Sequence, residues 1–243
     1  MELADGAKVG SSRTRWSVII AVFNEAGNIG PVTRQVREVI GPLHELIVVD
    51  DGSTDGTVAE LDPAICTILR HERNQGKGVA IRTGLAAATG DAILFMDGDG
   101  QDEPKEIPRL VEALEAGADF VIGSRFIGTL TPGAITPVNR LGNRCVTEIF
   151  RLVFGLRLTD SQASFKGVRA DKWREVRLQS QRYEIEAEML IRAIRRGLRI
   201  VEVPVTRYPR HHGISHLYGI PFGRLKFAYR LVRTVAKGYL FWA

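Results

Sequence analysis

The sequence predicts an α/β fold in which helices flank a mainly parallel central sheet. Three apolar runs, at 16–23, 46–49 and 92–96, have the length and composition of buried strands. A segment with helical spacing of apolar residues separates each run from the next. Strands that alternate with helices along the chain are typical of parallel sheets, because a crossover helix returns the chain to the edge where the previous strand began.

The first strand, at 16–23, is followed by Asn24 and Glu25, and then by a helix predicted at 32–40. The Gly-x-Gly-x-x-Gly fingerprint of dinucleotide-binding units does not follow this strand, and the chain contains no Walker A sequence. The pattern therefore argues against an NAD-dependent dehydrogenase.

The second strand, at 46–49, runs into the adjacent carboxylates Asp50 and Asp51. Ser-Thr-Asp follows at 53–55, and these residue types are good N-caps for a helix predicted after them. Capping does not explain two adjacent acids at a strand end. Because ligands of open α/β sheets bind beyond the carboxyl ends of the strands, this pair is a candidate ligand contact.

A glycine-rich turn, Arg-Asn-Gln-Gly-Lys-Gly at 73–78, precedes a helix predicted at 79–88. Lys77 lies between two glycines, and the free N–H groups at a helix start attract anions. The turn is a candidate diphosphate contact. On these residues alone, an ordinary turn with a solvated lysine is an open alternative.

The third strand, at 92–96, leads into Asp97 and Asp99. Two like charges at the end of a buried strand repel each other, and burial raises the cost. A divalent cation removes both problems, and these carboxylates with the nearby Gln101 amide suit Mg²⁺ or Mn²⁺. The alternative is an acidic, glycine-rich turn that is only solvated.

A series of short motifs extends from about Trp16 to Ser215. They are AVFNE at 21–25, VVDDGSTDGT at 48–57, NQGKG at 74–78, ATGD at 88–91, MDGDGQDEP at 96–104, GSRF at 123–126, RLGN at 140–143, TDSQASFK at 159–166 and HGIS at 212–215. In this order they resemble the family-two glycosyltransferases of the GT-A fold, and specifically the polyprenyl-phosphate (dolichyl-phosphate) mannosyl and glucosyl transferases. The resemblance implies inverting, metal-dependent transfer of a hexose from a nucleotide sugar to a polyprenyl phosphate.

The resemblance also implies a role for each matched position. Residues expected to contact the nucleotide sugar are Phe23, Glu25, Asp50, Asp51, Lys77 and Asp97. The expected ligands of Mg²⁺ or Mn²⁺ are Asp97, Asp99 and Gln101. Residues expected to contact the acceptor are Arg125, Asn139, Arg140, Ser215 and His216. The expected catalytic residues are Asp99, Arg125 and Asp160.

Two acidic residues of a helical segment at 184–190, Glu186 and Glu188, match family positions that support the site. The alternative is a helix face paired with nearby arginines, and for Glu188 it is at least as well supported.

The acceptor is the least determined partner. A phosphate monoester is already ionised near neutral pH, whereas a hydroxyl acceptor needs a base, for which Asp160 is the candidate. Asn139 stands where serine is common in the family, Ala-Ser-Phe at 163–165 replaces Cys-Gly-Phe or Ser-Gly-Phe, and Gly-Ile-Ser-His at 213–216 replaces Gly-x-Ser-Lys. A soluble hydroxyl acceptor, such as a small metabolite or saccharide, is therefore the alternative.

A second alternative is a non-catalytic subunit that binds sugar nucleotides, although the intact metal motif argues against it. The sequence does not choose between GDP- and UDP-hexose donors, and a homo-oligomer stays open.

Composition favours one domain, because a chain of 243 residues with 44% hydrophobic residues buries a substantial core. We expect the GT-A catalytic domain at 16–220, after a disordered lead at 1–15 that lacks the apolar region of a signal peptide. Cys66 and Cys145 have no metal-site spacing and suggest a reducing, cytoplasmic compartment. No apolar run reaches the roughly 18 residues that a membrane span requires.

The C-terminal segment, 221–243, is predicted to be a basic amphipathic helix. Residues 191–243 contain eleven Lys or Arg and one acid, Glu202. Four cations fall on one helical stripe: Lys226, Arg230, Arg233 and Lys237. The stripe either lies on an anionic membrane, as in a peripheral enzyme at the inner face, or is the solvated face of a helix packed on the sheet. Nucleic acid fits poorly, because basic charge alone does not make a nucleic-acid fold.

Overall fold

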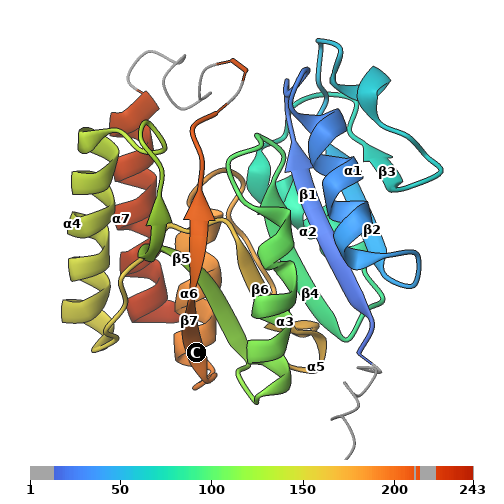
Figure 1. Ribbon diagram of the computed structural model, residues 1–243. Coiled ribbons are helices and arrows are strands. Elements are labelled where there is room, and N and C mark those ends of the chain that lie inside the picture. The colour runs from blue at the N-terminus through green and yellow to red at the C-terminus, as the bar shows by residue number, and fades with distance from the viewer. Residues whose placement is uncertain (1–13, 211, 214–222, 243) are drawn as a thin grey trace, which may run out of the picture.

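The computed structural model describes residues 14–210, 212–213 and 223–242. A seven-stranded sheet lies between two layers of helices, in the strand order β3-β2-β1-β4-β6-β5-β7 (Figure 1). The strands are β1 (Trp16–Val22), β2 (Glu45–Asp50), β3 (Thr67–Arg70), β4 (Ala92–Asp97), β5 (Phe120–Leu130), β6 (Lys166–Arg169) and β7 (Ile200–Arg207). All paired strands run parallel except β6, which is antiparallel to β4 and to β5.

The helices follow the strands in alternation over most of the chain. The α-helices are α1 (Ile29–Ile40), α2 (Lys77–Ala87), α3 (Ile107–Glu115), α4 (Pro137–Phe154), α5 (Ala170–Trp173), α6 (Ile185–Arg195) and α7 (Gly223–Phe241). Two 3₁₀ turns are η1 (Thr57–Glu60) and η2 (Pro104–Glu106). The predicted α/β fold with a mainly parallel sheet is confirmed.

Both faces of the sheet are buried, as expected for central parallel strands. Val18 and Ile20 of β1 point into a core shared with α1 and α3, whereas Ile19 points into the core shared with α2 and α6. The alternation follows from the two-residue period of a strand, which sends successive side chains to opposite faces. Because both faces are apolar, polar side chains of the central strands are confined to their ends.

The three strands predicted from the sequence are confirmed, and the two helices begin slightly earlier than predicted, at Ile29 and at Lys77. The helix expected after residues 53–55 is wrong, since only the 3₁₀ turn η1 follows and its N-cap is Gly56. The Ser53 hydroxyl instead accepts a hydrogen bond from the Asn24 N–H at 2.9 Å. The Ser53 hydroxyl therefore joins the turn after β2 to the turn after β1, and it does not cap a helix.

The C-terminal helix α7 packs against α6 through Leu231 and Val235, which belong to the same core as Ile191 and as Trp242, the residue after the helix. This packing agrees with the interpretation of α7 as a helix packed on the domain with a basic outer face. Binding of α7 to a membrane stays a prediction. Within the described part of the chain, no helix combines the length and apolarity that a bilayer span requires. The lead predicted at 1–15 lies almost wholly outside the described residues.

Close packing of α2 on β1 gives a test of the fold. A methyl group at Gly84 of α2 would overlap Ile19 Cγ2, while one at Gly142 of α4 would meet nothing within 4 Å. We expect Gly84→Ala to lower the free energy of unfolding by about 1–3 kcal/mol through overpacking. The matched control Gly142→Ala should raise it by about 0.5–1 kcal/mol, because alanine favours a helix interior. Urea denaturation measures both, and equal effects of the two changes would contradict the packing.

Candidate active site

The carboxyl ends of three neighbouring strands meet at one edge of the sheet. In the β1–β2 pairing Val22 lies opposite Asp50, and in the β1–β4 pairing Ala21 lies opposite Asp97. The acidic residues that follow these strands are therefore neighbours, as the sequence predicted from their positions. The chain leaves β1 through Asn24, which adopts a left-handed backbone conformation with φ of 52°.

Asp51 organises the turn that precedes α2. Its carboxylate is buried and accepts hydrogen bonds from the N–H groups of Gln75 at 2.9 Å and Gly76 at 2.7 Å. The neighbouring Asp50 is also buried, with Arg70 Nε 3.1 Å from its Oδ2. These contacts fix the turn from which Lys77 emerges at the start of α2.

Lys77 links two acidic residues from different elements. Its Nζ lies 2.6 Å from Asp97 Oδ1 and 2.7 Å from Glu186 Oε1. Burial would lower the pKa of Lys77, but the two carboxylates outweigh it and raise that pKa above its ordinary value. Glu186 also binds the buried Lys166, so α6 supports Lys77 from behind, as the resemblance implied.

The two candidate metal-binding carboxylates are surrounded by cations. Asp99 Oδ2 lies 3.2 Å from Arg210 Nη2 and 3.5 Å from Arg207 Nη2. Burial opposes the ionisation of Asp97, but Lys77 and Arg207 hold the pKa of this carboxyl well below its ordinary value. Asp97 is thus ionised at neutral pH, as a metal ligand must be.

Arg207, at the end of β7, contacts the rest of the acidic motif. Its guanidinium donates to Gln101 Oε1 at 2.9 Å and to Asp102 Oδ1 at 2.5 Å. Asp102 Oδ2 is buried and has no hydrogen-bond partner among the described residues, and burial raises the pKa of Asp102. The sequence analysis missed Asp102, Arg207 and Arg210. Asp102 lies within the MDGDGQDEP motif at 96–104, whereas nothing in the sequence distinguished the two arginines from the other C-terminal cations.

The residues present fit a divalent cation by their chemistry. Asp97 and Asp99 supply carboxylate oxygens, Gln101 supplies an amide oxygen, and the orphaned Asp102 oxygen lies on the same motif. Hard oxygen donors of this kind suit Mg²⁺ or Mn²⁺. Within residues 14–210, 212–213 and 223–242, no three His, Cys, Asp or Glu side chains converge as a metal site. The fit therefore depends on the carboxylate pair and the amide together.

Glu25 lies on the β1 side of the same edge. It is buried, and Arg210 Nη1 is 3.0 Å from each of its carboxylate oxygens. Burial raises the pKa of Glu25, although Arg210 and the Asn28 amide oppose the rise. Arg210 thus joins Glu25 to Asp99 across the site, with the half-buried Phe23 at the end of β1 nearby in the chain.

A second polar cluster lies on β5 and α4. Arg125 donates to both carboxylate oxygens of Asp160, with Nε 2.6 Å from Oδ2 and Nη2 2.8 Å from Oδ1. The Asn143 amide of α4 donates to Asp160 Oδ1 at 2.7 Å. Asp160 is fully buried, and burial would raise the pKa of its carboxyl, but Arg125 holds that pKa below its ordinary value. The geometry makes Asp160 a fixed support for the Arg125 guanidinium.

Two predicted acceptor residues lie at the start of α4, the helix that reaches this cluster through Asn143. Asn139 is half-buried and donates its N–H to the hydroxyl of the N-cap Thr136 at 3.3 Å, and Arg140 is exposed. Asn143, one turn further along α4, reaches Asp160, so the structure joins the RLGN and TDSQ motifs. The predicted acceptor residues Ser215 and His216 lie outside the described residues.

Glu188 has the structural role that the sequence left as its alternative. Its buried carboxylate accepts hydrogen bonds from the N–H groups of Gln179 at 2.9 Å and Ser180 at 2.6 Å. Arg192, one turn along α6, lies 3.4 Å away. Glu188 therefore stabilises the segment before α6 and does not face Lys77, in contrast to Glu186.

The match to a known family follows from the same part of the chain. The family model described as glycosyl transferase family 2 matches residues 17–177, which include the strand ends and the Arg125–Asp160 cluster. The chain belongs to glycosyltransferase family 2. It is 31% identical over 197 residues to glycosyltransferase AglJ of Haloferax volcanii, covering 81% of this chain and 64% of that protein.

This chain covers a larger share of a second relative. The polyprenol monophosphomannose synthase of Mycolicibacterium smegmatis is 32% identical over 221 residues, covering 84% of this chain and 82% of that protein. A structure of glucosyl-3-phosphoglycerate synthase from Mycobacterium tuberculosis with Mn²⁺, UDP-glucose and phosphoglyceric acid superimposes with a TM-score of 0.73 at 24% identity, covering 93% of this chain and 80% of that one. This likeness confirms the GT-A fold.

The pair of the buried Asp160 and the half-buried Arg125 predicts a pH-dependent stability difference. Because the folded protein lowers the pKa of Asp160, the stabilisation is present above its ordinary pKa of 3.8 and is lost as the pH falls through the lowered value. Asp160→Asn should cost about 3–5 kcal/mol of unfolding free energy at pH 7, because Arg125 loses its buried partner. Urea unfolding at pH 7 and pH 3 should show a smaller difference at pH 3. A difference that does not change with pH, or an equal loss in the exposed control Asp62→Asn, would contradict this assignment.

Proposed function

We propose that the protein is an inverting, metal-dependent glycosyltransferase that moves a hexose from a nucleotide sugar to a polyprenyl phosphate. The observation that carries the proposal is that the site contains two separate charged clusters, one suited to each substrate. Ionised carboxylates next to Lys77 form the donor side, and Arg125, held by Asp160, forms the acceptor side. The relatives support this reading, since one is named a polyprenol monophosphomannose synthase.

On the donor side, Asp97, Asp99 and Gln101 would hold Mg²⁺ or Mn²⁺. When bound, the cation would neutralise the negative charge on the departing nucleoside diphosphate. Lys77 adds a positive charge beside Asp97, fixed in place by Glu186. The structure of glucosyl-3-phosphoglycerate synthase, which has the same fold, contains Mn²⁺ and UDP-glucose, and this supports a divalent cation beside the donor.

The base and ribose of the donor would lie against the turns that follow β1 and β2. Phe23 and Glu25 follow β1, and Asp50 and Asp51 close β2 at the same level of the sheet. Both carboxylate oxygens of Asp51 already accept hydrogen bonds from backbone N–H groups of the turn before Lys77. In our proposal Asp51 therefore positions that turn as well as contacting the donor. GDP- and UDP-hexose both fit this description.

On the acceptor side, Arg125 would bind the attacking phosphate by charge-assisted hydrogen bonds, with Arg140 and Asn139 at the start of α4. Asp160 is ionised, buried and bonded at both oxygens, which suits it to positioning and makes it a weak proton acceptor. A phosphate monoester needs no base, because it is already ionised near neutral pH. This geometry is why we favour a polyprenyl phosphate over a hydroxyl acceptor.

A soluble acceptor is the second candidate. The glucosyl-3-phosphoglycerate synthase complex contains phosphoglyceric acid, which is small and soluble. Asn139 in place of the commoner serine keeps this alternative open. A non-catalytic role has less support, because the donor carboxylates and the Arg125–Asp160 pair are both intact. A screen of nucleotide sugars for metal-dependent thermal stabilisation, repeated with a short polyprenyl phosphate and with small phosphorylated acceptors, would identify both substrates.

The metal assignment predicts the effect of Asp99→Asn. The change keeps the shape of the side chain but removes a charged ligand, so turnover should fall by orders of magnitude and nucleoside diphosphate binding should lose its metal dependence. Product formation and calorimetry with and without a chelator measure the two effects. The control Asp171→Asn, at an exposed position on α5, should behave like the wild type. Near-normal turnover of Asp99→Asn, or full activity of the wild type in excess chelator, would refute the assignment.

The acceptor assignment predicts that Arg125→Ala and Arg140→Ala each raise the acceptor KM sharply and leave donor affinity nearly unchanged, because each loses a charge-assisted hydrogen bond to the acceptor phosphate. Steady-state kinetics with varied acceptor and calorimetry with nucleoside diphosphate separate the two effects. Arg144→Ala, an exposed change on α4, is the matched control. Weaker donor binding with an unchanged acceptor KM would assign these arginines to the donor side.

A further inference from the structure

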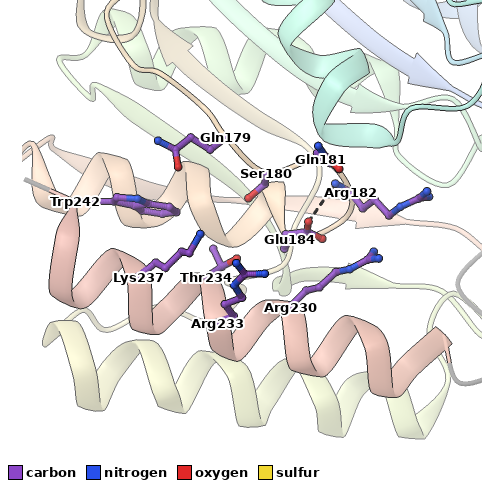
Figure 2. Close-up of a pocket in the computed structure, with 10 residues that line it drawn as sticks. All are labelled: Gln179, Ser180, Gln181, Arg182, Glu184, Arg230, Arg233, Thr234, Lys237 and Trp242. Atoms are coloured by element: carbon purple, nitrogen blue, oxygen red, sulfur yellow. Dashed lines mark hydrogen bonds between the residues drawn. The ribbon is translucent and has the colours of Figure 1, made fainter.

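A polar hollow of about 360 Å³ lies between α7 and the segment 179–184, which precedes α6 (Figure 2). Among the residues that the structure describes, four cations line it, and one carboxylate, that of Glu184. The cations are Arg182, Arg230, Arg233 and Lys237. Three members of the predicted basic stripe thus line a concave surface that the sequence could not show. Arg125 and Arg140, which we assign to the acceptor, are not part of this lining.

The three cations of α7 that line this hollow lack counter-charges among the described residues. In the part of the chain that the structure describes, Arg230, Arg233 and Lys237 have neither an ion-pair nor a hydrogen-bond partner. They follow one another at steps of three and four along the helix, where like charges repel. The arginines of the active site differ, since the half-buried Arg125 and the buried Arg207 are both paired with carboxylates. A bound anion would relieve the repulsion on α7.

Glu184 narrows the chemistry of the ligand. This residue is 9% exposed, its Oε1 accepts the Arg182 N–H at 3.3 Å, and its buried Oε2 has no hydrogen-bond partner among the described residues. A buried carboxylate oxygen needs a donor. A hydroxyl or ammonium group on a ligand bound among the cations would supply that donor. The hydroxyls of Ser180 and Thr234 add further polar contacts to the lining.

We infer that this hollow binds a phosphate ester that bears a hydroxyl or ammonium group, such as a glycerophosphate. The phosphate lies among Arg230, Arg233 and Lys237, where charge-assisted hydrogen bonds are strong. The hydroxyl or ammonium group donates to Glu184 Oε2. The inference does not depend on the proposed acceptor, because it rests on residues outside that site.

Two sources supply this chemistry: the headgroup of an anionic lipid and a free phosphorylated metabolite. The same helix also carries the exposed apolar side chains Tyr229, Val232 and Tyr239. Exposed aromatic and aliphatic groups next to a phosphate site are typical of a helix that lies at a lipid interface.

The wall of the hollow is continuous with the donor site. Ser180 O accepts a hydrogen bond from Arg82 Nη1 at 2.5 Å, and Gln181 O accepts one from the Gly78 N–H at 2.8 Å. Both donors belong to α2, the helix that begins at Lys77. The hollow therefore lies behind the donor site, on the other side of the segment 179–182.

The test uses the full chain in a chelator, which removes metal-dependent binding at the donor site. One arm measures co-sedimentation with vesicles of phosphatidylglycerol and phosphatidylcholine against vesicles of phosphatidylcholine alone, at low and high salt. The other arm titrates glycerol 1-phosphate and follows the indole N–H resonance of Trp242, which lines the hollow. The variant is Arg233→Gln with Lys237→Gln, and the control is Arg34→Gln with Lys172→Gln, an equal charge change at exposed positions on α1 and α5.

We expect the wild type and the control to bind, and the variant at α7 to bind at least tenfold more weakly. Binding to the anionic vesicles alone assigns the site to a lipid headgroup, and a shift of the Trp242 resonance by glycerol 1-phosphate alone assigns it to a metabolite. Failure of both probes to bind the wild type at low salt would overturn the inference, as would equal binding by the α7 variant. If the double change unfolds the protein, as judged by circular dichroism, the single changes Arg233→Gln and Lys237→Gln give the same test.

Discussion

Balancing the charge of carboxylates at the ends of buried strands is the constraint on which the active site depends. The central strands are apolar on both faces, so their acidic side chains lie at the strand ends. At the carboxyl edge, burial favours the neutral form of these carboxyl groups. The structure keeps Asp97 ionised by a chain of alternating charges, in which Lys77 contacts Asp97 and Glu186, and Glu186 contacts Lys166. Helices α2 and α6 are thereby tied to β4 and β6.

The same constraint shapes the acceptor side, where a single buried acid has a single cation. The Arg125 guanidinium donates two hydrogen bonds to Asp160, which fix its plane before any ligand binds. Asn143 of α4 donates a further bond, so the helix that carries Asn139 and Arg140 in its first turn is anchored to the same carboxylate. Preorganisation of this kind reduces the cost of ordering side chains when a ligand arrives.

Much of the donor site was predictable because it is local in the sequence. Asp50, Asp97 and Asp99 follow apolar runs directly, and parallel strands bring their carboxyl ends to one edge whatever the rest of the chain does. Arg207 and Arg210 were not predictable, because they come from the end of β7 and beyond, more than 100 residues after the motif that they contact. The helix predicted after residues 53–55 failed for a related reason: Ser53 bonds Asn24 across the site.

The sequence by itself determined the three central strands, the acidic residues at their carboxyl ends and the family motifs, since apolar periodicity and turn residues are properties of short segments. Only the tertiary structure decided which charges meet. It assigned Glu186 to Lys77 and Glu188 to a backbone turn, although the two lie two residues apart on one helix. It also turned the cations of α7 toward the segment 179–184. Partner choice among like residues depends on packing between distant elements, and helical spacing alone contains no information about it.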